Sequence, residues 1–305
     1  MKGQPPRISV VIPVRDEQDS LEPLVNSLRA VLVSSYELIF VDDGSTDETR
    51  KRLKRLHEPG RVRVLCLRKP YGKTAALMAG LAASRGEIVF TMDGDLQDDP
   101  AEIPRFVEQL DSGYELVCGW KKKRRDPIAK IVASRIFNLG IRRLTGLALH
   151  DVNCGFKAFR GDVARSLQLH GEMHRFIPVL VAEAGHRVGE IEVTHHPRRH
   201  GRSKYGFARL SKGFLDLVTV VLVTRFRERP AHGFGAAALG FLVLAATVLG
   251  LHLLLYPSPL LVLLAMTLLL GAIILIASGW VAEIIVARRP ASDKLPHYSV
   301  EEQLD

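Results

Sequence analysis

Two aspartates near the middle of the chain, Asp93 and Asp95, have the spacing of a site for a divalent cation. They follow an apolar run, residues 88–92, that has the length of a buried β-strand. Two carboxylates separated by one residue can converge on a hard cation such as Mg²⁺ or Mn²⁺, which substrate phosphates commonly complete. Gln97 points to the same side of an extended segment and could add an oxygen. An isolated Asp-x-Asp is also common in turns, so the surrounding elements decide between the two interpretations.

Those elements alternate between strands and helices. Strands are expected at residues 8–14, 37–41, 62–67 and 88–92, and helices at residues 20–33, 46–57 and 73–84. This alternation predicts an α/β fold with a mostly parallel sheet and helices on both faces. Ligands bind beyond the carboxyl ends of such strands. Because Pro13–Glu17, Asp42–Asp43 and Asp93–Asp95 all follow strand ends, three acidic clusters are expected on one rim of the sheet.

Two apolar segments, Phe234–Leu255 and Leu260–Val281, are long enough to cross a membrane. Each holds 22 uncharged residues, which form a helix of about 33 Å against a hydrocarbon core of about 30 Å. Arginines flank the pair on both outer sides and the turn between them is uncharged, so both ends are expected in the cytoplasm. The stretch 207–226 has an apolar face and is expected to lie in the membrane interface. A core helix of the soluble domain is the alternative for that stretch, and a buried helical hairpin is the alternative for the two segments.

The charge of the chain favours anionic partners. Its 305 residues carry a net charge of +9, and the excess gathers at residues 121–125, 198–204 and 225–229. Phosphates and lipid headgroups suit such clusters, whereas nucleic-acid binding is not expected because no recognition helix or zinc module accompanies them. The three cysteines are far apart in the sequence and predict buried thiols in a reduced compartment. No signal peptide is expected.

Six ordered motifs run through the first two thirds of the chain. They are Val11-Ile-Pro-Val-Arg-Asp-Glu17, Val41-Asp-Asp-Gly-Ser-Thr-Asp47, Gly72-Lys-Thr-Ala-Ala-Leu77, Met92-Asp-Gly-Asp-Leu-Gln97, Asp151-Val-Asn-Cys-Gly-Phe156 and Arg198-Arg-His-Gly-Arg-Ser-Lys-Tyr205. Over residues 7–210 the chain resembles the GT-A glycosyltransferases of family 2, in particular the polyprenyl-phosphate branch. The apolar hairpin is similar to that of bacterial membrane-anchored members. One departure is Asp-Gly-Asp where Asp-Ala-Asp is commoner; glycine lowers rigidity but keeps both carboxylates.

The resemblance implies a role for each matching residue. The residues implied for the nucleotide pocket are Pro13, Glu17, Asp43 with Asp42 as its rival for the base or ribose, Lys73 and Asp93. The metal and diphosphate would be held by Asp93, Asp95 and Gln97. The implied acceptor-phosphate residues are Arg135, Arg198, Arg202, Ser203 and Lys204, and the implied catalytic residues are Asp95, Arg135, Arg198 and Lys204.

Several of these residues have an alternative role in the fold. Asp47 is expected to cap the next helix rather than to bind a ligand. Asp151 either braces a cation such as Arg135 or contacts the acceptor. His195 and His196 are expected to be packing or phosphate-adjacent residues rather than metal ligands.

The activity that the resemblance implies is inverting, metal-dependent sugar transfer from a UDP- or GDP-sugar to a polyprenyl phosphate, with Mg²⁺ or Mn²⁺ as cofactor. A lipid phosphomonoester is largely dianionic at neutral pH, so it needs cations that hold it rather than a general base. One alternative is transfer to a hydroxyl of a glycan or glycolipid, but the acidic base motif and the Gln-x-x-Arg-Trp of such enzymes are missing at the matching places. Another is a catalytically silent, membrane-tethered protein that binds nucleotide sugars. The identity of the sugar stays open.

The expected organisation has four parts. Residues 1–206 form a cytosolic, Rossmann-like GT-A domain, residues 207–232 an interfacial amphipathic segment, residues 233–289 a transmembrane hairpin and residues 290–305 a cytosolic tail. The expected location is the inner (cytoplasmic) membrane of a bacterial cell, with the catalytic domain and both termini in the cytoplasm. Members of this branch can form homo-oligomers.

Overall fold

The computed structural model describes residues 5–33, 35–122, 138, 141–143, 146–197, 226, 229–254, 257–287 and 300–304. The chain divides into two units. The first comprises Met1–Asp216 together with Pro296–Asp305, and the second comprises Leu217–Leu295.

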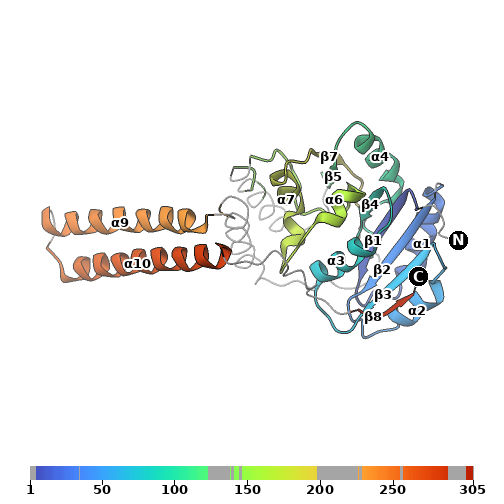
Figure 1. The fold of residues 1–305 in the computed structure, drawn as a ribbon, viewed down its shortest axis with the longest axis horizontal. Coiled ribbons are helices and arrows are strands. Elements are labelled where there is room, and N and C mark those ends of the chain that lie inside the picture. The colour runs from blue at the N-terminus through green and yellow to red at the C-terminus, as the bar shows by residue number, and fades with distance from the viewer. Residues whose placement is uncertain are drawn as a thin grey trace. The chain divides into compact units, whose positions relative to one another are not determined.

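The first unit is a sheet with helices packed against it (Figure 1). Its strands are β1 (Ile8–Val14), β2 (Tyr36–Asp42), β3 (Val62–Leu67), β4 (Ile88–Thr91), β5 (Leu116–Trp120), β6 (Lys157–Arg160), β7 (Val188–Glu192) and β8 (Val300–Leu304). Its helices are α1 (Leu21–Val31), α2 (Thr49–Leu56), α3 (Lys73–Ala83), α4 (Ile103–Asp111), α6 (Gly161–Ser166) and α7 (Ile177–Glu183), with 3₁₀ turns η1 (Pro100–Glu102) and η2 (Met173–Phe176).

The strand order is β7-β5-β6-β4-β1-β2-β3-β8. Strands β4, β1, β2 and β3 pair in parallel, whereas β6 and β8 run antiparallel to their neighbours. The prediction of a mostly parallel sheet flanked by helices is confirmed. The antiparallel strand β6, inserted between β4 and β5, had no counterpart in the predicted pattern.

The order of the strands explains which face each helix covers. The chain moves in one direction from β1 to β3, so α1 and α2 lie on the same face. It then returns past β1 to β4, so the right-handed crossover places α3 on the opposite face. Side chains of α1, α2 and α4, such as Leu24, Leu53 and Phe106, share one core with Phe40 and Phe90 of the sheet.

The last strand was not expected from the sequence, which had suggested only a tail for residues 290–305. Strand β8 pairs antiparallel with β3, with Val64 opposite Leu304 and Leu65 opposite Gln303. It covers the edge of the sheet that β3 would otherwise leave open.

The second unit is a helical hairpin of α9 (Pro230–Leu254) and α10 (Pro259–Ala287). The helices pack antiparallel, with Gly271 against Phe241 and Gly279 against Phe234. The carboxylate of Glu283 accepts a hydrogen bond from the backbone N–H of Ala231 at 2.9 Å, which satisfies a donor that a helix N-terminus leaves unpaired.

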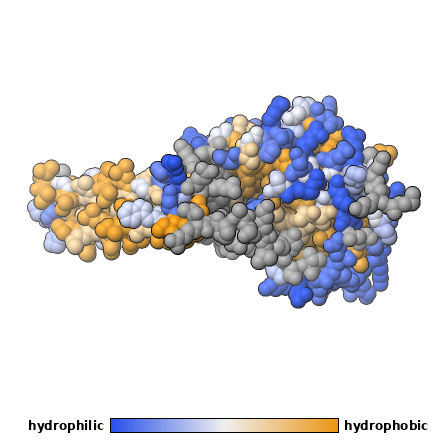
Figure 2. Space-filling view, viewed as in Figure 1, coloured by the Kyte–Doolittle hydropathy of each residue, from blue (hydrophilic) through white to orange (hydrophobic). Residues whose placement is uncertain are grey.

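The surface of this hairpin is apolar over most of its length (Figure 2). Only 11% of the most apolar 18-residue window of each helix is buried. Many large leucine, isoleucine and valine side chains of both helices are therefore exposed. A core hairpin of a soluble domain would bury these side chains, so the expectation of two candidate membrane helices is confirmed. Most of the predicted interfacial segment, residues 207–232, lies outside the described residues.

A buried carboxylate ties the amino ends of the central strands together. The side chain of Glu37 is 0% exposed and accepts hydrogen bonds from Ser9 Oγ at 2.6 Å and from Arg63 Nη1 at 3.1 Å. The backbone N–H and the guanidinium of Arg85 also donate to it. Burial alone would raise the pKa of Glu37, but these hydrogen bonds lower it below its ordinary value of 4.5.

We expect Glu37→Gln to lower the free energy of unfolding by about 3 kcal/mol at neutral pH, because it leaves the buried Arg63 without its anion. The matched control is Glu58→Gln, which breaks an exposed pair with Arg29 and should change stability by less than about 1 kcal/mol. Thermal unfolding of the detergent-solubilised chain measures both.

The two variants should also differ in their pH dependence. Since the folded pKa of Glu37 is lowered, its contribution is complete above the ordinary value and is lost as the pH falls through the folded pKa. The gap between the parent chain and Glu37→Gln should therefore narrow in acid. Equal destabilisation by the two variants, or a gap that stays constant with pH, would contradict this account.

Candidate active site

The segments that follow β1, β2 and β4 leave the sheet at the same edge. In the parallel register Val14 lies opposite Asp42, and Val11 lies opposite Thr91. The three predicted acidic clusters therefore meet on one rim, as the strand order of an open parallel sheet requires.

The loops after β1 and β2 are joined by hydrogen bonds. The N–H of Asp16 donates to Ser45 Oγ at 2.9 Å, and the N–H of Glu17 donates to Thr49 Oγ1 at 2.8 Å. Pro13 and Glu17, at and just after the end of β1, are both partly exposed. The prediction that Pro13 and Glu17 contact a nucleotide is compatible with these positions.

Asp42 and Asp43 are both engaged with protein groups. Asp42 is 0% exposed; its Oδ1 accepts from Ser45 N and its Oδ2 accepts from Arg50 Nε, both at 2.9 Å. The two oxygens of Asp43 accept the N–H groups of Tyr71 at 2.7 Å and Gly72 at 2.9 Å. Burial raises the pKa of Asp43, although these two N–H groups oppose the shift. Of the two rivals for the base or ribose, only Asp43 is exposed at all, at 5%.

Lys73, which follows Gly72 and begins α3, reaches the third acidic cluster, Asp93–Asp95. Its Nζ lies 2.5 Å from Asp93 Oδ1, and both side chains are about one third exposed. Behind this pair, Lys121 Nζ lies 2.7 Å from the buried Asp98 Oδ1. Burial would raise the pKa of the Asp93 carboxyl, but the two ammonium groups hold it well below its usual range. Asp93 is therefore ionised at neutral pH.

Two glycines, Gly94 and Gly155, leave room for close packing around the Asp93-Gly-Asp95 turn. A Cβ on Gly94 would lie 2.7 Å from Val14 Cγ1, so the Asp-Gly-Asp turn packs directly on the end of β1. A Cβ on Gly155 would lie 2.7 Å from Asp93 Oδ2, so Gly155 provides the recess for that carboxylate. The first contact means that an alanine at position 94 would fit only if the Val14 side chain moved.

Asp95 and Gln97 follow in a tight loop. Asp95 is 9% exposed, and its Oδ1 lies 3.3 Å from the N–H of Gln97. The Gln97 amide lies 3.3 Å from His195 Nε2 and 3.2 Å from the His196 carbonyl oxygen. His196 Nε2 lies 3.0 Å from Asp99 Oδ2. The two histidines thus pack against this loop, in line with the packing role expected of them.

The donor set fits a divalent cation in part. Among the described residues no group of three or more His, Cys, Asp or Glu side chains is placed to hold a metal. Asp93 and Asp95 nevertheless follow the same strand end, and the absence of a side chain at Gly155 leaves room for the Asp93 carboxylate. Gln97 already hydrogen-bonds to the histidine segment. The carboxylates suit a hard cation that substrate oxygens complete.

Sequence reasoning missed three residues near this rim. Lys121 had been noted only as the first residue of a basic run, and Gly155 only as part of a motif. His174 carried no signal in the sequence, yet its Nδ1 lies 2.8 Å from Thr74 Oγ1. Burial, together with the charge on Lys73, lowers the pKa of His174 to about 3, so its ring is neutral.

Asp151 and Asp47 both take part in hydrogen bonds with neighbouring protein groups. Asp151 is buried, and its backbone N–H donates to Glu190 Oε1 at 2.8 Å. Asp47 Oδ1 accepts the N–H of Thr49, the first residue of α2, at 2.9 Å, although the N-cap position itself is held by Glu48. The predicted acceptor-phosphate residues, namely Arg135, Arg198, Arg202, Ser203 and Lys204, lie outside the described residues, and their roles stay predictions.

Among solved structures the chain resembles glucosyl-3-phosphoglycerate synthase from Mycobacterium tuberculosis. In its complex with phosphoglyceric acid, that enzyme matches 72% of this chain and 80% of its own, with a TM-score of 0.56 and 23% identity. The same enzyme with Mn²⁺, UDP-glucose and phosphoglyceric acid matches 72% of this chain and 79% of its own, again with a TM-score of 0.56 and 23% identity. This likeness shows the GT-A fold.

Closer relatives are found by sequence. Dodecaprenyl-phosphate galacturonate synthase of Rhizobium johnstonii is 38% identical over an alignment 314 residues long, which covers 98% of this chain and 93% of that relative. Undecaprenyl-phosphate 4-deoxy-4-formamido-L-arabinose transferase of Edwardsiella ictaluri is 40% identical over 239 residues, which is 77% of this chain and 74% of that relative.

The motifs on the rim fall within a single family model. That model, described as glycosyl transferase family 2, matches residues 9–168, which run from β1 through α6 and include the acidic clusters after β1, β2 and β4. With this match, the GT-A fold and a relative that aligns along nearly the whole chain, the chain belongs to glycosyltransferase family 2.

Proposed function

We propose that this chain is a membrane-bound, inverting transferase that moves a sugar from a nucleoside diphosphate onto a polyprenyl phosphate. The observation that carries the proposal is the alignment with the Rhizobium relative. It covers 98% of this chain and so extends over the catalytic sheet and the apolar hairpin together. The names of both relatives describe sugar transfer to a polyprenyl phosphate.

The donor would bind on the rim between β1, β2 and β4. Pro13, Glu17 and Asp43 would contact the nucleoside, and Lys73 would face the diphosphate. Support for Lys73 comes from its 2.5 Å pair with Asp93, because an ammonium group at this position can be shared with phosphate oxygens. Asp42 is fully buried, which favours a supporting role for it.

Asp93 and Asp95, with Gln97 if its amide turns toward them, would hold Mg²⁺ or Mn²⁺. When bound, such an ion neutralises charge on the leaving diphosphate. The structural neighbour that contains Mn²⁺ and UDP-glucose lends support by analogy of fold, and it also favours UDP over GDP as the donor nucleotide.

The acceptor phosphate would act as the nucleophile without a general base, because it is already largely dianionic at neutral pH. One of its oxygens forms the new bond to the anomeric carbon while the bond from that carbon to the nucleoside diphosphate breaks. Arg135, Arg198 and Lys204 would orient the phosphate, with Arg202 and Ser203 beside them. The hairpin α9–α10 would lie in the bacterial inner membrane with both termini in the cytoplasm, as the flanking arginines favour.

A transfer assay with the full chain tests this function. The purified protein is incubated with Mn²⁺, undecaprenyl phosphate and, in turn, UDP-galacturonic acid, UDP-glucose and GDP-mannose. We expect one donor to yield a lipid-linked sugar that mild acid releases, and chelation of the metal to stop the reaction. Sugar found instead on a hydroxyl acceptor, or no turnover despite bound nucleotide, would contradict the proposal.

Asp95→Asn should lower kcat by about 100-fold or more, because it removes one of the two anionic ligands from the proposed cation site. Thermal unfolding should stay close to that of the parent chain. Asp111→Asn, which changes an exposed carboxylate on α4, is the control and should retain activity. Full activity of Asp95→Asn at limiting Mn²⁺ would remove this residue from the site.

Gly155→Ala should lower kcat by about 10- to 100-fold, because the new Cβ would displace the Asp93 carboxylate by several tenths of an ångström or more. Gly240→Ala in α9 adds the same methyl group where no atom lies within 4 Å and should leave kcat unchanged. The two variants are compared by steady-state kinetics and by the Mn²⁺ concentration that gives half-maximal rate. A normal Mn²⁺ requirement in Gly155→Ala would argue against the recess.

Arg198→Ala should raise the KM for undecaprenyl phosphate at least fivefold while changing the KM for the sugar donor much less, since a guanidinium binds phosphate in a charge-assisted, bidentate manner. Both KM values are measured in the same detergent. If the donor KM rises and the lipid KM does not, Arg198 belongs to the donor side instead.

A further inference from the structure

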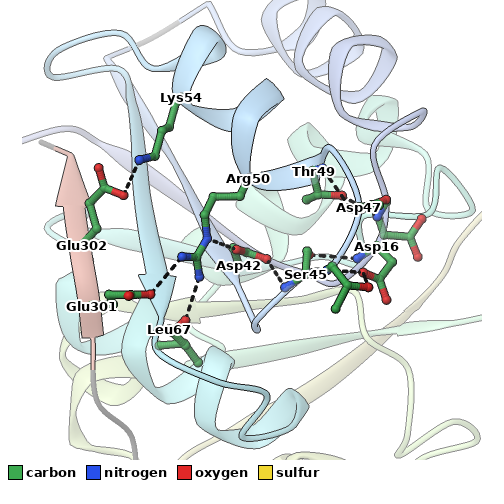
Figure 3. A network of polar contacts seen from close by, with 12 residues as sticks. Asp16, Asp42, Ser45, Asp47, Thr49, Arg50, Lys54, Leu67, Glu301 and Glu302 are labelled. Atoms are coloured by element: carbon green, nitrogen blue, oxygen red, sulfur yellow. Dashed lines mark hydrogen bonds and ion pairs between the residues drawn. The ribbon is translucent and has the colours of Figure 1, made fainter.

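One arginine of α2 joins three strands of the sheet at the rim. Arg50 donates from Nε to Asp42 Oδ2, from Nη1 to Glu301 Oε2 and from Nη2 to the carbonyl oxygen of Leu67, each at 2.9 Å (Figure 3). Its partners come from the ends of β2 and β3 and from β8. All three sides of the guanidinium therefore have an acceptor, which fixes the orientation of its plane.

Asp42 connects Arg50 to the loops that follow β1 and β2. Its side chain is fully buried, and its second oxygen accepts the N–H of Ser45. The Ser45 hydroxyl in turn accepts the N–H of Asp16 (Figure 3). Asp16 Oδ1 accepts the N–H of Thr46. The chain of contacts thus runs from Glu301 to the loops that carry Glu17 and Asp43.

Strand β8 offers two glutamates to α2, and only one of them connects to this network. Glu301 pairs with Arg50, whereas the neighbouring Glu302 pairs with Lys54 at 2.6 Å. Both pairs join the same strand to the same helix. Within the described part of the chain, no hydrogen bond or ion pair joins Lys54 to the loops of the rim, whereas Arg50 is joined to them through Asp42.

We propose that β8 is a positioning strand for the donor-binding loops: Glu301 orients Arg50, and Arg50 holds Asp42 and the Asp42–Asp47 loop in the conformation that binds the nucleotide sugar. The segment of the chain that follows the membrane hairpin thereby sets donor affinity. This inference rests on the proposed function, since it takes these loops to be the donor side of the site.

The other explanation is that β8 only covers the edge of the sheet. In that case the two glutamates are equivalent, because each adds one ion pair between β8 and α2. A role in positioning separates them, because only the loss of Glu301 reaches Asp42.

The test compares Glu301→Gln with Glu302→Gln in the full chain. We expect Glu301→Gln to raise the donor KM by about three- to tenfold, with the lipid KM and the melting temperature close to those of the parent. The range is modest because Arg50 and Glu301 side chains are 30% and 47% exposed, so solvent screens the pair. Glu302→Gln should change the donor KM by less than about twofold.

Hydrogen exchange gives a second readout that needs no substrate. In Glu301→Gln the backbone amides of Ser45 and Thr46 should exchange at least threefold faster than in the parent, and in Glu302→Gln they should exchange at the parental rate. Arg50→Lys, which cannot reach three acceptors at once, should match Glu301→Gln, and the double variant should add no further loss.

The outcomes separate the two proposals. If the parent chain transfers no sugar from any donor, the proposed function fails whatever the exchange rates show. If the parent is active and the two glutamine variants share the same donor KM and exchange rates, β8 is only an edge cover and the positioning role is wrong.

Discussion

The parallel pairing of β1 with β2 on one side and with β4 on the other is the constraint on which the site depends. Because β1 lies between β2 and β4 and all three strands run parallel, their carboxyl ends lie at the same edge of the sheet. The register places Val14 beside Asp42 and Val11 beside Thr91. A slip of one residue would turn each strand over and would carry the acidic clusters away from one another.

The carboxylates that gather there repel one another, and three of them form an ion pair with a lysine or an arginine. Two are buried completely: the side chains of Asp42 and Asp98 are 0% exposed and pair with Arg50 and Lys121. Asp93 differs, since one third of its side chain is exposed beside Lys73. A buried pair is costly to break because it leaves an unpaired charge behind, so Asp42 and Asp98 act as scaffold. In the proposed function the more accessible Asp93–Lys73 pair would exchange partners for a cation and a phosphate.

Much of this arrangement could be predicted from residue patterns alone. The four central parallel strands, their helices and the rim followed from hydrophobic runs and from the rule for open sheets. The sequence could not predict which basic residue pairs with Asp98, because Lys121 stands in a run of lysines and arginines that all suit a carboxylate equally well. The two backbone N–H groups that the Asp43 carboxylate accepts could not be predicted either, because an aspartate that contacts a ligand and one that caps a loop have the same sequence pattern. Strand β8 was missed because Val-Glu-Glu-Gln-Leu has little strand propensity, and the open edge of β3 decides its conformation.

The proposed transfer brings two phosphate-bearing substrates together, which would account for the net positive charge of a protein whose rim carries several acidic residues. The diphosphate of the donor and the phosphate of the lipid are both anions, and each pair of unit charges 4 Å apart repels by about 4 kcal/mol at an effective dielectric constant of about 20. The fixed carboxylates of the rim would add to that repulsion if they were left bare. Arg50, Lys73 and Lys121 neutralise them from within the fold. The net charge of +9 then leaves an excess of cations, and placing part of that excess on the acceptor side would let the second anion approach the first.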